Sequence, residues 1–282
     1  MLTCLTPSVL IATSTAILTS TRITTYMVIM SSKHSQATPR MEPDPNQTFS
    51  SAADLAFLRL LHLSDSALPI GALAHSFGLE SLVSAEALNV GALPGFLRGY
   101  LQEAGMLEGV ACREAFRLAP AEQQKFFAVR WIEINDCLSA LKPARESRVA
   151  SAALGRNFLQ AALALGDFPV LQEARDASLK SMSLMHHAAA FGLVSATFGF
   201  NETHAVLAYL HQMTTSLVSA CQRLLPIGQN AATCILWNLK PAIVETSELS
   251  ANCTLDTVDC FMPLLDWGAM AHPALPTRLF IS

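Results

Sequence analysis

Prolines and glycines divide the chain after Asp54 into segments of the length of helices. A proline fits the first turn of a helix but not its interior, so each one sets a boundary. Between these boundaries apolar residues recur at helical spacing, and no stretch of useful length alternates as a strand would. Segments open at Pro94, Pro120, Pro143 and Pro169, and another ends at Pro226 and Gly228. The sequence therefore predicts one all-α domain, a single helical bundle of about ten helices.

The apolar segment 186–199 is rich in small residues, so we expect it at the centre of the bundle. Asn201 is expected to cap the helix that follows it through its side-chain oxygen. The last core helix is expected to end near Leu239. The other expected helices run over 54–63, 75–88, 94–118, 143–165, 169–182 and 202–225, with one more opening at Pro120.

The two ends of the chain differ from this helical domain, which we place at 54–261. Residues 1–53 form an extension, interpreted as an artefact of the start site, a disordered tail or a membrane or export signal. Its first 21 residues are apolar and hydroxylated, but no basic residue precedes them as in a secretory signal. Residues 262–282 contain three prolines and are expected to form a non-helical tail. Because this tail ends in Leu279, Phe280 and Ile281, we expect it to dock on a protein surface.

Composition excludes several classes of protein. Hydrophobic residues make up 51% and charged residues 14% of the chain, whereas about 25% charged is usual. The net charge of -4 argues against non-specific binding to nucleic acid. Seven cysteines are scattered without a CxxC pair, which indicates reduced, buried thiols in a cytosolic protein.

Catalytic and metal-binding patterns are missing from the sequence. His75 and Ser76 are adjacent, so on a helix they diverge, and no GxSxG motif accompanies them. His186 and His187 also diverge and are interpreted as hydrogen-bonded core or interface histidines. His204 and His211 lie about two turns apart, on a wet helix face. Without a phosphate-binding loop, the chain is not expected to hydrolyse GTP or ATP. We therefore assign no catalytic residue, metal or cofactor.

The remaining candidates for structural or partner-binding residues lie in two closely specified turns and at one charged helix start. The first turn carries Ser66, Leu68, Pro69, Gly71, His75, Ser76, Gly78 and Glu80. Asp65 and Ser66 there suit turn chemistry. The second is formed by Arg223, Pro226, Gly228 and Gln229, where we expect a buried glutamine. The charged helix start has Arg145, Glu146 and Arg148, which is either a solvated first turn or a contact for an acidic partner.

Four segments together resemble the UreF family of urease accessory proteins. They are SDSALPIGALAHSFGLE at 64–80, ARESRVASAALGRNFL at 144–159, RLLPIGQ at 223–229 with HHAAAFG upstream, and the terminal TRLFIS. Their order and approximate spacing fit the family from about Asp54 onward. The first and third are fairly specific in combination, whereas any one alone is weak.

The resemblance implies a cytoplasmic, dimeric, all-α adaptor without catalysis of its own. It implies binding to UreD (called UreH in some species) and to the GTPase UreG, for nickel insertion into apo-urease. The family's C-terminal partner-binding segment falls on Arg278, Leu279 and Phe280. We add Arg145, Glu146 and Arg148 as a charged contact and expect 68–80 to shape the interior or the dimer contact. Neither nucleic acid nor a membrane is an expected partner.

Departures from the family and rival functions complete the sequence-based picture. Ala72 stands where the family has a second glycine, and Pro273 follows His272 where an acidic residue is usual. One rival is a small all-α metal-dependent hydrolase that uses His75 and Glu80. Another is a membrane-anchored helical protein that uses residues 1–21 as a span.

Overall fold

A computed structural model describes residues 52–119 and 126–282, and within these ranges it is all-α, without strands. The chain divides into two units, 1–49 and 50–282, and every described residue belongs to the second. The helices are α2 (Ala52–Leu63), α3 (Leu79–Ser84), α4 (Leu93–Tyr100), α5 (Met106–Phe116), α6 (Phe127–Ala140), α7 (Arg145–Leu163), α8 (Pro169–Ser181), α9 (His187–Thr197), α10 (Glu202–Leu224), α11 (Gln229–Asn238), α12 (Lys240–Ser250) and α13 (Pro263–Ala271). The predicted all-α fold is confirmed.

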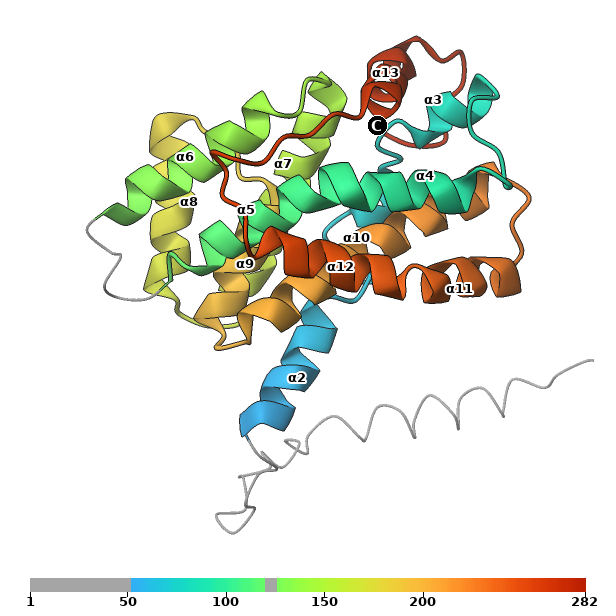
Figure 1. Cartoon of the computed structure of the whole chain (residues 1–282). Coiled ribbons are helices and arrows are strands. Elements are labelled where there is room, and N and C mark those ends of the chain that lie inside the picture. Colours follow the sequence, from blue (N-terminus) through green and yellow to red (C-terminus); the bar gives the residue numbers. More distant parts are fainter. Residues whose placement is uncertain (1–51, 120–125) are drawn as a thin grey trace, which may run out of the picture. The chain divides into compact units, whose positions relative to one another are not determined.

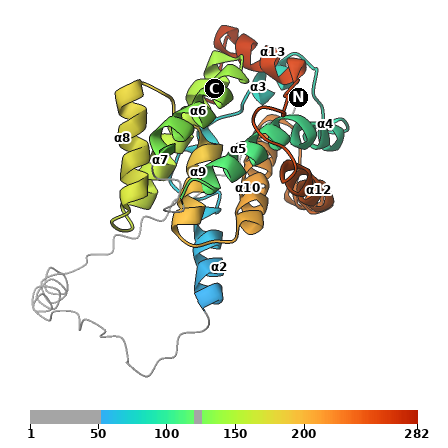
Figure 2. The same cartoon turned by 60° about the vertical axis from the view of Figure 1, so that its left-hand side comes forward.

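Helix α9 lies at the centre of the bundle, as its composition predicts (Figures 1 and 2). Every residue from His187 to Ser195 is buried. The helix packs mainly on α5 and α7, and also contacts α8 and α10. A helix that is apolar on all sides has to be enclosed in this way.

Two glycines allow these helices to approach to backbone contact. A methyl group added at Gly192 of α9 would lie 2.0 Å from the carbonyl oxygen of Cys112 in α5. One added at Gly155 of α7 would lie 2.0 Å from the carbonyl oxygen of Met185, which precedes α9. The small residues of the central segment therefore set the spacing of the core.

Most predicted boundaries agree with the structure. Pro94 and Pro169 lie in the first turns of α4 and α8, and Asn201 accepts a hydrogen bond from the His204 N–H at 3.0 Å. Helices α4 and α5 are joined by a π-helical turn, Leu101–Gly105, so helix runs from Leu93 to Phe116. The predicted start at Pro120 lies outside the described residues.

Three predictions about the helices are wrong. The expected helix at 75–88 is only α3, because the chain forms a 3-10 turn at Ala72–Ala74 and then extends at His75. Helix α12 was not expected after Leu239, yet Pro241 fits its first turn. Helix α13 occupies the predicted non-helical tail for the same reason: Pro263 opens it, and Pro273 lies beyond its end. Only the stretch after the 3-10 turn His272–Ala274 is non-helical.

We predict that Gly192→Ala lowers the free energy of unfolding by about 3 kcal/mol, the upper part of the usual range for overpacking. The added methyl group meets the backbone of α5, which cannot rotate away as a side chain can. Gly99→Ala is the matched control, because nothing lies within 4 Å of its added carbon. That substitution should stabilise helix α4 by about 0.5–1 kcal/mol. Urea unfolding followed by circular dichroism measures both, and equal stabilities would contradict the close approach.

Candidate functional site

The C-terminal tail, residues 275–282, docks against the segments that the sequence analysis singled out. Glu80 and the turn 71–78 contact it from the first segment, Glu146 from the second and Arg223 from the third. Helix α13, which precedes the tail, packs on α3 and α7, and α13 and α3 lie side by side near the C-terminal end in Figure 1. The four separated segments thus form one site, the tail dock.

The Glu80 carboxylate holds the backbone of the tail. Its Oε1 accepts a hydrogen bond from the Leu279 N–H at 2.5 Å, and its Oε2 accepts one from the Phe280 N–H at 3.1 Å. Burial alone would raise the pKa of Glu80, but these N–H groups and the His272 ring hold it below its ordinary value. An ionised, largely buried carboxylate is therefore the central acceptor of the site.

His272 links Glu80 to a second carboxylate. The fully buried ring places Nε2 2.9 Å from Glu80 Oε2 and Nδ1 2.8 Å from Glu146 Oε2. Each ring nitrogen therefore lies within hydrogen-bond distance of one carboxylate oxygen. Arg278 lies 3.9 Å from the other oxygen of Glu146. His272, Arg278 and the two carboxylates therefore connect α3, α7 and the tail.

The turn 71–78 supplies backbone partners for the last two residues. The N–H groups of Ser76 and Phe77 donate to the backbone oxygen of Ser282 at 2.5 and 3.3 Å, and the Ile281 N–H donates to Ala74 O at 2.9 Å. Gly71 and Gly78 have positive φ, as such a turn requires. A side chain at Gly78 would also meet the backbone of α13, 2.6 Å from Ala269 N. Both glycines are thus structural residues of the dock.

The side chains of Phe280 and Leu279 in the tail differ in burial. Phe280 is 5% exposed, and the Arg223 guanidinium lies 4.2 Å from its ring centroid while donating to Leu73 O. Cation–π contacts of this kind contribute about 0.5–1 kcal/mol. Leu279 is 53% exposed. In this arrangement Phe280 packs on its own chain, and the Leu279 side chain stays exposed.

The other predicted site residues have varied positions. Arg145 is exposed, whereas Arg148 donates to the backbone oxygens of Lys142 and Pro143. Asp65 accepts from the Ala67 N–H, which confirms its turn role, and Ser66 and Leu68 are half-buried beside exposed Pro69. The expected burial of Gln229 is wrong. As the first residue of α11 it points outward, with Pro226 and Gly228 also exposed, and Ile227 is buried instead.

His75 and Glu80, the pair that the rival hydrolase hypothesis uses, both make contacts with the C-terminal tail. The His75 Nδ1 lies 2.7 Å from Ser282 Oγ, and burial lowers the pKa of His75 while Glu146 opposes that shift. Glu80 is occupied by the tail and His272. Among the described residues no group of three His, Cys, Asp or Glu side chains could hold a metal ion. Over the same ranges no helix is long and apolar enough to cross a membrane, and residues 1–21 lie outside them.

The remaining histidines and thiols give a mixed result. His186 is fully buried between the Ser151 and Ser139 hydroxyl groups, which confirms a hydrogen-bonded core histidine. Burial lowers its pKa to about 3, with further lowering by Lys142. His204 is exposed, but His211 is half-buried against Lys240 rather than fully wet. The expectation of buried thiols fails at Cys234, which is exposed.

A buried polar cluster at Glu108 was missed by the sequence analysis. Buried Glu108 contacts the Lys142 ammonium group and the Tyr209 hydroxyl group. Glu108 lies among apolar residues of α5, directly after Leu107 and two residues before Val110. That local surrounding is the only signal in the sequence, and it does not reveal the distant partners.

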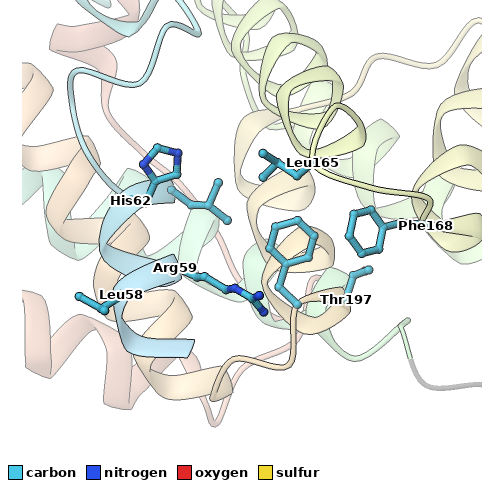
Figure 3. A pocket seen from close by; sticks show the side chains of 8 residues that line it. Leu58, Arg59, His62, Leu165, Phe168 and Thr197 are labelled. Carbon is cyan, nitrogen blue, oxygen red and sulfur yellow. The ribbon is translucent and has the colours of Figure 1, made fainter. Parts of the chain in front are cut away.

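A groove of about 540 Å³ lies apart from the tail dock, between α2 and the region of Leu165, Phe168 and Thr197 (Figure 3). Arg59 extends across it from α2, and His62 lies on the same helix. Its lining is mostly apolar. Arg59 and His62 are the titratable side chains that line it.

We predict that Glu80→Gln lowers the hydrogen-exchange protection of the Leu279 and Phe280 amides by about 10–100-fold. Glutamine has one acceptor oxygen and no charge, so at least one charge-assisted bond of about 1.5–3 kcal/mol is lost. Amide exchange resolved by NMR measures the change. Exposed Glu86→Gln, also near α3, is the control and should leave both amides protected. Unchanged protection in Glu80→Gln would remove the carboxylate from the dock.

Acidification should loosen the same contact. A carboxylate with a lowered pKa stabilises the folded state above its ordinary pKa, here 4.5, and that contribution is lost as pH falls through the lowered value. We therefore expect the Leu279 protection factor to fall below about pH 4.5 relative to that of Leu193 in α9. The Glu80→Gln protein should lack this dependence. If the Leu279 protection factor fell equally in the unaltered and the Glu80→Gln protein, the effect would be due to global unfolding.

Comparison with known proteins identifies the family. The UreF family model matches residues 88–240. The urease accessory protein UreF of Nostoc sp. is 32% identical over 231 residues, covering 81% of this chain and 97% of that protein. UreF of Corynebacterium glutamicum is 32% identical over 81% of this chain and 99% of its own. UreF of a Bradyrhizobium species is 30% identical over 82% and 94%. With a model match over more than half its length and such relatives along most of it, this chain belongs to the UreF family.

Proposed function

We propose that this protein is an adaptor of urease maturation that binds UreD (UreH) and the GTPase UreG. It has no catalytic activity of its own, and GTP hydrolysis takes place on UreG. The assembly inserts nickel into apo-urease, with the adaptor acting as a homodimer in the cytoplasm. The names of the relatives support the role in urease maturation, and the tail dock supports the role as a binding protein.

The observation that carries this proposal is a tail with a fixed backbone and exposed apolar side chains. Leu279 and Ile281 are 53% and 70% exposed, although the N–H groups of both are hydrogen-bonded. They line a groove of about 490 Å³ together with Leu68, Leu73 and Arg223. Fixing the backbone of a free tail during binding costs about 1–2 kcal/mol for each residue. A docked tail has already met this cost, which favours partner binding.

Helix α13 adds apolar surface close in sequence to the tail. Leu264, Trp267 and Met270 recur at intervals of three residues and are 44–55% exposed, and Phe261 before them is 78% exposed. Exposed apolar side chains in such a series are typical of interaction surfaces. We assign α13 and the tail to UreD binding. The exposed Arg145 and Arg278 and the partly exposed Glu146 are assigned to charged contacts at its rim.

We predict that Leu279→Asp combined with Ile281→Asp reduces the amount of UreD recovered with this protein at least tenfold. Each buried leucine or isoleucine contributes about 1.5–3 kcal/mol to an interface, and tenfold corresponds to about 1.4 kcal/mol. The full chain is co-expressed with UreD and UreG from the same genome and purified by a tag. Light scattering then gives the molar mass of the complex.

Leu179→Asp on α8 is the matched control, because Leu179 is 66% exposed and lies outside the dock. It should leave UreD recovery and helicity unchanged. Equal recovery with the tail variant would remove the tail from the mechanism. If the unaltered chain forms no complex with UreD or UreG, the adaptor function itself is wrong.

A further inference from the structure

A cavity of about 40 Å³ lies inside the bundle and shares only Ala72 with the groove that Leu279 and Ile281 line. Ala72 and Phe77 of the turn 71–78 form part of its wall, and buried residues of α5, α9 and α10 form much of the rest. One water molecule needs about 10–15 Å³ measured in this way, so the cavity has room for about three or four. It is far below the roughly 300 Å³ typical of sites for organic ligands.

Two buried polar atoms at this cavity lack a partner among the described residues. They are Gln212 Oε1 and His187 Nε2, on side chains of residues only 3% and 8% exposed. The Gln212 amide nitrogen donates to Asp65 O at 3.4 Å, which assigns the oxygen to the other branch of the amide. An unsatisfied buried acceptor costs about 1–3 kcal/mol. Two such atoms at one cavity therefore indicate a small hydrogen-bonding ligand.

The Glu108 carboxylate gives the cavity a charged wall. Burial would raise its pKa, but the Lys142 ammonium group and the Tyr209 hydroxyl group hold the pKa below its ordinary value. Both carboxylate oxygens have a protein partner and retain capacity for further hydrogen bonds. Additional hydrogen bonds are what a buried ion pair needs to offset its loss of hydration.

We propose that this cavity is a binding site for a small cluster of water molecules, held by Gln212 Oε1, His187 Nε2 and the Glu108 carboxylate. A water molecule both donates and accepts, so it complements the glutamine oxygen, the carboxylate and either form of the imidazole. Burial lowers the pKa of His187 to about 4, so the ring is neutral at neutral pH. The cluster hydrates the buried ion pair from within the bundle.

The charges favour water over a metal cation. Lys142 already neutralises Glu108, so a divalent ion would add uncompensated positive charge next to an ammonium group. His187 and Glu108 are the cavity's only His, Cys, Asp or Glu residues in the described ranges. An empty cavity is also disfavoured, because dry cavities have apolar walls.

The test is oxygen-17 relaxation dispersion of water, which counts long-lived internal water molecules in the full chain. A protein of this length holds on the order of ten. Ala72→Val places two extra carbons at the cavity wall and should remove at least one long-lived water. Ala74→Val is the matched control from the same 3-10 turn, since Ala74 is only half-buried and does not line this cavity. An unchanged count in Ala72→Val would overturn the proposal.

The urea midpoint also distinguishes a hydrated cavity from a dry one, because filling the two shifts it in opposite directions. Displacing bound water leaves Gln212 and His187 without partners, so Ala72→Val should unfold at lower urea concentration than Ala74→Val. Filling a dry cavity would raise the midpoint instead. If Ala72→Val does not fold, the proposal is tested by NMR on the unaltered protein labelled with nitrogen-15. Cross-relaxation between water and the Gln212 side-chain amide protons is expected, and its absence would overturn the proposal.

Discussion

The bond between the Glu80 carboxylate and the tail amides is the interaction on which the candidate site depends. Residues 276–282 lie beyond the last helical turn, so their N–H groups have no helical partners. A backbone segment without such partners stays on a protein surface only if other groups accept its hydrogen bonds. Glu80 supplies two of these acceptors with one charge, and His272 ties that charge to α7. The position of the tail therefore follows from a short buried segment of α3.

The central helix explains how so many polar groups can be buried nearby. Gly155 and Gly192 bring α7, α9 and α5 to backbone contact, which fixes these helices without large side chains. Such close packing leaves little freedom for rearrangement. His186 can then be held between two serine hydroxyl groups, and Glu108 can face Lys142 and Tyr209 across helices. Rigid packing and satisfied polar groups thus support each other.

Local signals made the helices predictable, because prolines, caps and apolar periodicity act within a few residues. Asn201, Pro94 and Pro169 show this, and so does the small-residue composition of α9. The apolar end of the tail likewise predicted docking. The surface on which the tail docks was not predictable from physics alone. Glu80 and Leu279 are far apart in sequence, and no local pattern links them. The outward direction of Gln229 depends on packing in the same way, whereas the helix after Leu239 has a local signal in Pro241.

The turn 71–78 connects the two polar features of the protein. Phe77 has φ 53°, which is uncommon for a residue with a side chain and costs about 1–3 kcal/mol. Such a conformation persists only where neighbouring contacts determine it. The N–H of Phe77 faces the tail at Ser282, while its ring lines the internal cavity. Docking of the tail and packing against the cavity therefore act on one strained residue, and the geometry of each depends on the other.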